Sequence, residues 1–196
     1  MERLDNIINK MKYHGMATLS NRVNIQIDNA KEIFIDTFRA FLSVQNKEMV
    51  YLPEYDEIVS WLSNNEGKGL FLYGNIGRGK TFISRYIIPS ILLKHERKVV
   101  NFFDVQEMNQ RLEEVLSKKI ICIDDVGLEE LSNIYGNKRL AFLEVLDATE
   151  KDGKLLIVTS NLANTEQIIA KYGDRGLDRI IATTKRIVFK GNSLRK

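Results

Sequence analysis

Cysteine, histidine and proline are scarce in this chain of 196 residues, which has one cysteine, two histidines and two prolines. The single thiol, Cys122, forms no internal disulfide, and it lies in an apolar run where we expect a buried, unreactive side chain rather than a nucleophile. His14 and His95 are far apart, and no cysteine is near either of them. This scarcity argues against a disulfide framework and against a zinc site.

Long apolar runs and a large charge of one sign are missing as well. No apolar stretch is long enough to cross a bilayer and the first residues lack the pattern of a secretory signal, so we expect a cytoplasmic protein with no membrane partner. The composition, 44% hydrophobic and 28% charged, is that of a globular protein. The net charge is only +3, but residues 185–196 read KRIVFKGNSLRK and contain no acid. That segment is either a solvated terminal strand or one that contacts phosphate.

A glycine-rich loop is the most informative feature that is present. Residues 74–81 read GNIGRGKT, the G-x-x-x-x-G-K-T pattern of a phosphate-binding loop. Its glycines let the backbone turn its N–H groups toward phosphate oxygens, its lysine reaches the β- and γ-phosphates, and its threonine hydroxyl binds Mg²⁺. The residues expected to bind nucleotide are therefore Gly74, Asn75, Ile76, Gly77, Arg78, Gly79, Lys80 and Thr81.

The flanks of the loop favour this interpretation over a glycine-rich turn that matches by chance. Residues 69–73 form a short apolar run typical of a strand, and residues 81–94 carry apolar side chains at helical spacing, with a kink expected at Pro89. Strand, loop and helix in this order are the setting that a phosphate-binding loop requires.

A second strand pattern ends in two carboxylates. Residues 120–123 are all apolar, as in a parallel strand buried on both faces, and Asp124 and Asp125 follow at the end where ligands bind in open α/β sheets. After a phosphate-binding loop this is a Walker B pattern, in which Asp124 holds Mg²⁺ together with Thr81, and Asp125 orients or deprotonates the attacking water. The alternative is a strand followed by a polar turn.

A third buried strand, residues 154–161, ends Thr-Ser-Asn. In a parallel sheet its end would lie beside the loop, where Asn161 reaches the attacking water or the γ-phosphate. Alternatively, Ser160 or Asn161 caps a helix over residues 165–172. Further on, Arg175 and Arg179 stand one helical turn apart and suit charge stabilisation from a neighbouring subunit, unless they only form ion pairs with the nearby Asp174 and Asp178.

These patterns predict an α/β fold: a P-loop NTPase three-layer sandwich with a central parallel sheet and a short helical N-terminal extension. We expect the extension over residues 1–49 and the ATPase domain over residues 50–196. Within the domain, a helix is expected from Pro53 to about Ser63, a strand over residues 98–103, and a helix over residues 105–117 capped by Asp104.

The order of motifs resembles the AAA+ ATPases of the DnaC/IstB class, which are helicase loaders and transposition helpers. The resemblance rests on the loop, the Asp-Asp strand, the Thr-Ser-Asn strand, then G-D-R-x-x-D-R at residues 173–179 and G-x-S-x-R at residues 191–195. It implies that Asn161 is the sensor 1 asparagine, Arg179 the arginine finger supported by Arg175, and Arg195 the sensor 2 arginine. The stretch between the second strand and Asp124 is shorter than is usual in the class.

The resemblance also implies ATP and Mg²⁺ as cofactors, a nucleotide-dependent homo-oligomer, and DNA as a partner, with single-stranded DNA favoured. The function expected first is ATP hydrolysis coupled to loading or remodelling of a replicative helicase. The alternative is an IstB-type transposition helper that partners a transposase. A P-loop small-molecule kinase and a nucleotide-gated DNA-binding module are further possibilities, and the Asp-Asp strand followed by Asn161 favours water as the acceptor over a kinase substrate.

Overall fold

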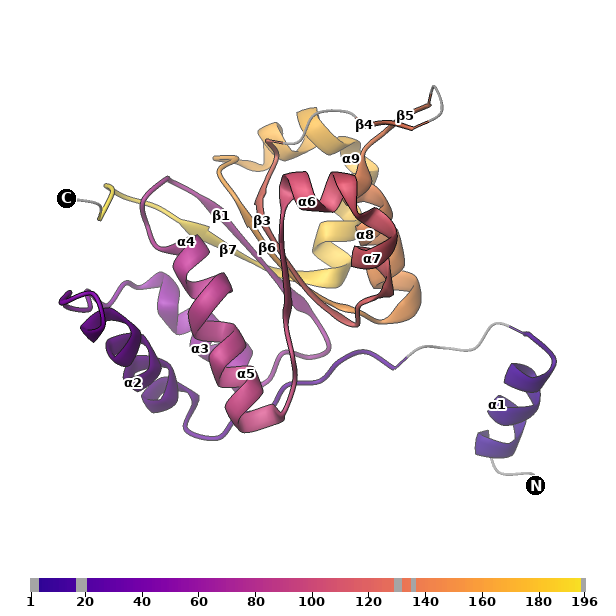
Figure 1. Cartoon of the computed structure of the whole chain (residues 1–196), viewed down its shortest axis with the longest axis horizontal. Coiled ribbons are helices and arrows are strands. Elements are labelled where there is room, and N and C mark those ends of the chain that lie inside the picture. Colours follow the sequence, from indigo (N-terminus) through magenta and orange to yellow (C-terminus); the bar gives the residue numbers. More distant parts are fainter. Residues whose placement is uncertain (1–3, 17–20, 129–131, 135–136, 195–196) are drawn as a thin grey trace.

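A computed structural model describes residues 4–16, 21–128, 132–134 and 137–194. A central sheet lies between two layers of helices, with α2, α3, α4 and α5 on one side and α6, α7, α8 and α9 on the other (Figure 1). The predicted α/β sandwich with a parallel sheet is confirmed.

The sheet has five parallel strands in the order β2-β3-β6-β1-β7. Strand β6 therefore pairs with β1 on one side and with β3 on the other, and β4 pairs with β5 in a separate antiparallel sheet. The strand bounds are β1 (Gly69–Gly74), β2 (Asn101–Asp104), β3 (Ile120–Val126), β4 (Ser132–Ile134), β5 (Asn137–Arg139), β6 (Leu155–Ser160) and β7 (Thr184–Phe189).

The helices other than α1 cover both faces of this sheet. The helix bounds are α1 (Leu4–Tyr13), α2 (Ala30–Ser43), α3 (Glu54–Ser63), α4 (Lys80–Phe82), the π-helical turn η1 (Ile83–Ile87), α5 (Ile88–Glu96), α6 (Val105–Gln110), α7 (Leu112–Ser117), α8 (Ala141–Asp152) and α9 (Thr165–Thr183).

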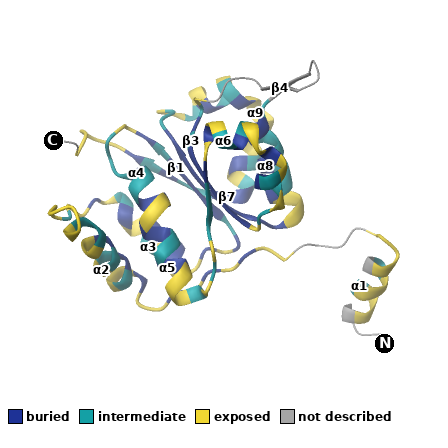
Figure 2. Ribbon diagram, in the orientation of Figure 1, coloured by how far each residue is buried: buried dark blue, intermediate teal, exposed yellow. Residues whose placement is uncertain are grey.

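Strands β1, β3 and β6 are buried on both faces, as their uninterrupted apolar runs predict. Successive side chains alternate between the two helical layers: Leu70 and Leu72 pack toward α3 and α5, whereas Phe71 packs toward α8 and α9. Figure 2 shows these strands in dark blue through the centre of the molecule. Because both faces are covered, the register of these strands is fixed, and so is the position at which each strand ends.

The helix after the phosphate-binding loop differs from the single kinked helix that the sequence predicts. It is divided into α4, η1 and α5, with Pro89 in the first turn of α5. Proline has no N–H to donate to the carbonyl four residues earlier, and its ring clashes with that carbonyl. The wider π-helical turn directly before Pro89 accommodates this local defect.

Asp104 begins helix α6 with a capping box, which confirms the predicted cap. Its carboxylate accepts hydrogen bonds from the N–H groups of Gln106 (2.8 Å) and Glu107 (2.7 Å), and the Glu107 side chain accepts one from the Asp104 N–H. The helix predicted to continue to residue 117 is interrupted at Arg111, where φ and ψ are −124° and 37°, so two short helices replace it.

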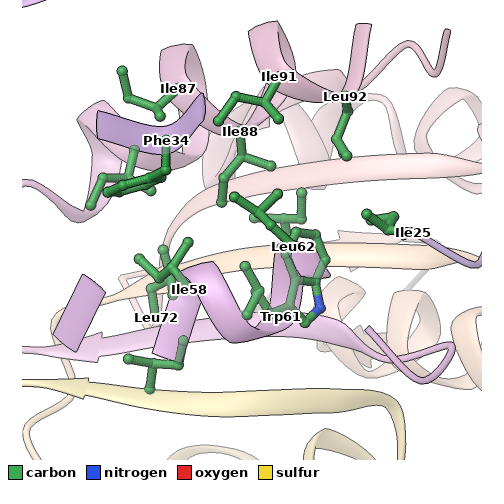
Figure 3. Close-up of a cluster of buried hydrophobic side chains, with 14 of the residues drawn as sticks. Ile25, Phe34, Ile58, Trp61, Leu62, Leu72, Ile87, Ile88, Ile91 and Leu92 are labelled. Atoms are coloured by element: carbon green, nitrogen blue, oxygen red, sulfur yellow. The ribbon is translucent and has the colours of Figure 1, made fainter. Parts of the chain in front are cut away.

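The N-terminal residues divide into parts with different environments. Helix α1 stands apart from the body in Figure 1, whereas residues 21–27 run along the body as an extended segment without helix or strand and end in a turn at residues 28–29. Ile25 and Phe34 are buried in the same cluster as Trp61 and Leu92, as Figure 3 shows. Part of the predicted extension therefore belongs to the core on the α3 and α5 side of the sheet. Among the described residues, no helix is long and apolar enough to cross a membrane.

Asn65 attaches the extended segment to the body. It is 3% exposed; its Oδ1 accepts from the N–H of Ile25 (2.8 Å), and its Nδ2 donates to the carbonyls of Val23 (2.9 Å) and Lys68 (3.0 Å). The buried side-chain amide of Asn65 thus supplies hydrogen-bond partners to backbone groups of two segments that are not paired in a β-sheet.

We expect Asn65→Ala to lower the free energy of unfolding by about 2–3 kcal/mol, because it leaves buried backbone groups unpaired. Urea titration measures the change. The exposed neighbour Asn64, whose side chain accepts one bond from the N–H of Glu66, is the control, and Asn64→Ala should cost below about 1 kcal/mol. Equal losses for the two variants would show that Asn65 does not hold the segment.

Candidate functional site

Strand β6 brings the predicted motifs to one edge of the sheet. Because it pairs in parallel with both β1 and β3, the ends of all three strands lie side by side: Tyr73 is opposite Ser160, and Ser160 is opposite Val126. The glycine-rich loop follows β1, Asp124 and Asp125 lie at the end of β3, and Asn161 follows β6. Side chains more than eighty residues apart in sequence thus meet at the carboxyl edge of the sheet.

The glycine-rich loop has the backbone that its sequence demands. Gly77 has a φ of 78°, and a Cβ at this position would lie 2.1 Å from the hydroxyl of Ser193. Both the left-handed conformation and the lack of space require glycine. Lys80 is 5% exposed, and its Nζ donates to the carbonyls of Gly74 (2.9 Å) and Asn75 (2.8 Å), which holds the ammonium across the loop. Ile76, at the outer turn, is 62% exposed.

Thr81 and Asp124 meet although they are far apart in sequence. The Thr81 hydroxyl donates to Asp124 Oδ1 at 3.0 Å, and Asp124 is 8% exposed. A hydroxyl and a carboxylate are hard oxygen donors of the kind that Mg²⁺ takes, and they lie directly beside the phosphate-binding loop. The two residues expected to hold the metal are therefore adjacent.

Asp125 lies in a bulge of β3. Between the pairs Ile123–Val158 and Val126–Ser160, β3 advances by three residues and β6 by two, so β3 carries one extra residue. Asp125 has a φ of 57°, in the left-handed region that residues with a Cβ seldom adopt. Its carboxylate accepts a hydrogen bond from Asn161 Nδ2 at 2.9 Å. The bulge redirects this second carboxylate toward Asn161.

The alternative role considered for the Thr-Ser-Asn strand end is wrong. The helix that follows is capped by Asn164, whose side chain accepts from the N–H of Gln167 at 3.0 Å. Ser160 instead donates to the carbonyl of Val126, and Asn161 is directed to Asp125. The helix begins several residues after the strand ends, so neither Ser160 nor Asn161 is at its first turn.

The C-terminal segment packs on the phosphate-binding loop, a contact that the sequence did not indicate. Asn75 Nδ2 donates to the carbonyl of Gly191 (2.9 Å), and the N–H of Leu194 donates to the carbonyl of Gly77 (2.9 Å). Residues 185–189 of the basic segment lie in β7, which confirms the predicted terminal strand, and the residues after it contact the loop. Contact of this segment with phosphate stays a prediction. Arg195 lies outside the described residues.

Arg78 connects the loop to both ends of the domain. Its guanidinium donates to Glu54 Oε1 (3.0 Å) and to the carbonyl of Asn192 (3.3 Å), and the side chains of Arg78 and Glu54 are each only 11% exposed. Glu54 Oε1 also accepts from the N–H of Lys190 (3.1 Å). We call Glu54, Arg78, Lys190 and Asn192 the loop clasp.

The electrostatics of the loop clasp favour an ionised Glu54. Burial raises the pKa of this carboxyl, but hydrogen bonds from its own N–H, from Arg78 and from the N–H of Lys190, with the charge of Arg78, outweigh burial and lower the pKa below its ordinary 4.5. One position in the loop that the motif leaves variable is thus occupied by a nearly buried, paired arginine.

Arg179 lies on α9, facing α8. It forms an ion pair with Asp147 and a longer one with Glu150 (3.6 Å), and its side chain is 19% exposed. The alternative of ion pairs with Asp174 and Asp178 is wrong for Arg179, because its carboxylate partners Asp147 and Glu150 lie on α8. Arg175 is 77% exposed and lies 3.8 Å from Asp147. Neither arginine approaches the phosphate-binding loop of its own chain through any contact among the described residues.

A cavity of about 580 Å³ opens beside the two carboxylates. One wall is the first turns of α6 with the Asp104 cap, and the opposite wall is the end of β3. Its lining residues are Asp104, Val105, Gln106, Asn109, Gln110, Asp124, Asp125 and Leu128. Cys122, on the same strand, is completely buried, as predicted, and burial raises the pKa of its thiol to about 12.

The loop clasp makes stability depend on the ionisation of Glu54. We expect Glu54→Gln to lower the free energy of unfolding at pH 7 by about 1–3 kcal/mol, because it removes the charge that pairs with a nearly buried arginine. Since the folded-state pKa is below 4.5, this contribution is complete above that pH and is lost as the pH falls through the folded-state pKa.

Denaturant titrations at pH 7 and at a series of values below 4.5 measure this effect, and the difference between wild type and variant should shrink as the pH falls. Glu57→Gln, at an exposed position on the same helix, is the control and should show no comparable loss. A difference that stays constant across the series would contradict the assignment.

The family model described as Novel STAND NTPase 3 matches residues 49–193 of the chain. Among curated proteins, the replicative helicase loader DnaI of Bacillus subtilis (strain 168) is 28% identical over 89 residues. The match covers 40% of this chain and 29% of DnaI, so it spans less than a third of that relative's length.

Solved structures share the fold. A crystal structure of the DnaC helicase loader superposes with a TM-score of 0.52 at 20% identity, covering 84% of this chain and 93% of that one. A DnaI structure has a TM-score of 0.52 at 20% identity and covers 84% of this chain and 87% of that one. For AMPPCP-bound DnaA from Aquifex aeolicus, the TM-score is 0.51 at 16% identity, and the match covers 71% of this chain and 48% of that one. Since the family model covers most of the chain, the chain belongs to the Novel STAND NTPase 3 family and has the fold of DnaC-like AAA+ ATPase domains.

Proposed function

We propose that this chain is a Mg²⁺-dependent ATPase of the AAA+ type that assembles with copies of itself on DNA and loads or remodels a replicative helicase. The observation that carries the proposal is the meeting of two pairs at one edge of the sheet. Thr81 bonds to Asp124 beside the phosphate-binding loop, and Asp125 bonds to Asn161 next to them. Phosphate binding, metal binding and water activation thus have candidate residues within one site.

In the proposed binding step, the loop from Gly74 to Lys80 wraps the phosphates. Lys80 exchanges the two carbonyls that it contacts here for phosphate oxygens, which carry full negative charge. The loop clasp limits how far the loop moves in this exchange, because Arg78 is fixed to Glu54 and Asn192.

The residues present fit a magnesium ion. Thr81 and Asp124 offer oxygen ligands, and no three His, Cys, Asp or Glu side chains gather as an independent metal site in the part of the chain that the structure describes. Thr81 and Asp124 would therefore be the protein ligands, with phosphate and water completing the shell. When bound, Mg²⁺ neutralises charge on the phosphate oxygens.

In the proposed hydrolytic step, Asp125 accepts a proton from the attacking water and Asn161 orients it. The Asp125 carboxylate accepts a hydrogen bond from Asn161, which places both side chains at the same point of the site, and general base catalysis contributes about 10²–10⁴-fold to the rate. The transition-state charge is stabilised by Arg179 from an adjacent copy, with Arg175 in support and Arg195 as the sensor 2 arginine.

Assembly changes the surroundings of Arg179 in this proposal. In the single chain its guanidinium is held by Asp147 and Glu150. In an oligomer it would exchange these surface carboxylates for the phosphate of a neighbour, which makes hydrolysis depend on assembly.

The loader role is supported by the likeness to DnaI, which is a replicative helicase loader. Only 29% of DnaI is matched, so the helicase partner and the preference for single-stranded DNA are proposals for this chain. The cytoplasmic location and the division into an extension of residues 1–49 and an ATPase domain of residues 50–196 also remain predictions.

Two variants test the shared active site. We expect Asp125→Asn to keep ATP binding but to lower hydrolysis at least about 100-fold, and Arg179→Ala to behave likewise. An equimolar mixture of the two variants should regain activity. The Arg179→Ala chain retains Asp125 and the Asp125→Asn chain retains Arg179, so random assembly completes the site at about one quarter of interfaces. Phosphate release measures hydrolysis, and fluorescence of an N-methylanthraniloyl ATP measures binding.

Asp147→Asn is the control for the finger, because it removes the partner of Arg179 within the chain and leaves the arginine in place. It should retain activity. If Asp147→Asn loses as much ATP hydrolysis as Arg179→Ala does, the arginine acts only through its ion pair. If the mixture of Asp125→Asn and Arg179→Ala stays inactive, the arginine finger does not act between copies.

Light scattering after size exclusion tests the assembly. With ATP and Mg²⁺, we expect the chain to form a larger species, to bind a single-stranded oligonucleotide better than a duplex, and to elute with the replicative helicase of its own organism. The physical reason is that an interface completed by nucleotide is stabilised by mass action. Preference for duplex without helicase binding would favour the transposition helper, and a monomer indifferent to nucleotide and DNA would contradict assembly.

A further inference from the structure

Thr159 is the penultimate residue of β6 and lies between the two carboxylates of the site. It is completely buried. Its hydroxyl donates to Asp124 Oδ1 and accepts a hydrogen bond from the N–H of Asp125 at 2.9 Å. One side chain therefore contacts the proposed metal ligand and the backbone of the proposed general base.

The direction of these bonds is fixed by chemistry. An N–H only donates, so the Asp125 N–H occupies a lone pair of the Thr159 oxygen, and the single hydroxyl proton is left for Asp124. Asp124 Oδ1 also accepts from the Thr81 hydroxyl at 3.0 Å. The carboxylate of Asp124 is thus oriented by two hydroxyls, one from the loop and one from the neighbouring strand.

The bond to Asp125 acts where the backbone is unusual. The bulge places Asp125 at a φ of 57°, in the left-handed region that residues with a Cβ seldom adopt. The bulge also removes this N–H from the regular ladder between β3 and β6. The Thr159 oxygen supplies the acceptor instead, and the carboxylate that follows reaches Asn161.

We propose that Thr159 is a positioning residue of the ATPase site, whose one hydroxyl fixes Asp124 for the metal and Asp125 for the water. The inference rests on the proposed function, and it adds a residue to which neither the motifs nor the family pattern gave a role. Outer-shell partners of this kind typically change metal affinity or activity 10–100-fold when they are removed.

The variants are Thr159→Val, which keeps the shape and removes the hydroxyl, and Thr159→Ser, which keeps the hydroxyl. Thr149→Val is the matched control, because Thr149 is also buried and its hydroxyl donates to the carbonyl of Val145 within α8, away from the site. Comparison of the two valine variants separates the general cost of removing a buried hydroxyl from the effect on the carboxylates.

We expect Thr159→Val to bind the N-methylanthraniloyl ATP as wild type does in EDTA, since the loop and Lys80 are intact. Its half-saturating Mg²⁺ concentration for tighter nucleotide binding should rise at least about tenfold, and kcat should fall by a similar factor with little change in KM. Thr159→Ser should return both within about threefold of wild type, and Thr149→Val should match wild type.

Hydrogen exchange measured by mass spectrometry gives a readout that needs no nucleotide. The segment containing the Asp125 amide should exchange at least about tenfold faster in Thr159→Val than in wild type or Thr149→Val. If wild type neither binds nor hydrolyses ATP, the proposed function fails, and the exchange result still decides whether Thr159 holds Asp125. If Thr159→Val has the same Mg²⁺ response, kcat and hydrogen exchange as wild type, the inference is wrong.

Discussion

The parallel pairing of β6 with β1 and β3 is the constraint on which the rest of the molecule depends. Each of these strands is buried on both faces. A shift of one residue in the strand pairing would therefore point each apolar strand side chain into the opposite helical layer. The register is therefore fixed, and with it the level at which each strand ends. The loop after β1, the carboxylates at the end of β3 and Asn161 after β6 are brought together by this register rather than by any attraction among themselves.

The site departs from regular structure where its chemistry requires it. One extra residue in β3 places Asp125 in a left-handed conformation, and the buried hydroxyl of Thr159 and the amide of Asn161 hold it there. Unfavourable backbone conformations persist where surrounding bonds over-determine them, and such positions gather at functional sites. The loop clasp is the corresponding device on the other side of the phosphate-binding loop, where Arg78 joins α3 and the C-terminal segment.

Much of the architecture was predictable because it is governed by local patterns. Uninterrupted apolar runs predicted β1, β3 and β6, and the side-chain chemistry of Asp104 predicted the capping box of α6. Elements that depend on non-local packing were not predicted. Helix α8 supplies the carboxylates that pair with Arg179, and the contact between residues 190–194 and the loop joins segments more than a hundred residues apart. No local pattern specifies such partners.

The sequence by itself determined the inventory of the site: a phosphate-binding loop, two carboxylates after one buried strand, and Asn161 after another. These follow from residue type and spacing, because the glycine pattern and the apolar runs are local features of the sequence. The tertiary structure alone decided which side chains contact each other. It placed Thr159 between the carboxylates and paired Arg179 with α8, and it gave the Thr81–Asp124 pair, which the motifs predicted, a direct hydrogen bond. Hydrogen bonds and ion pairs act over a few ångströms, and only the packed sheet determines which residues come that close.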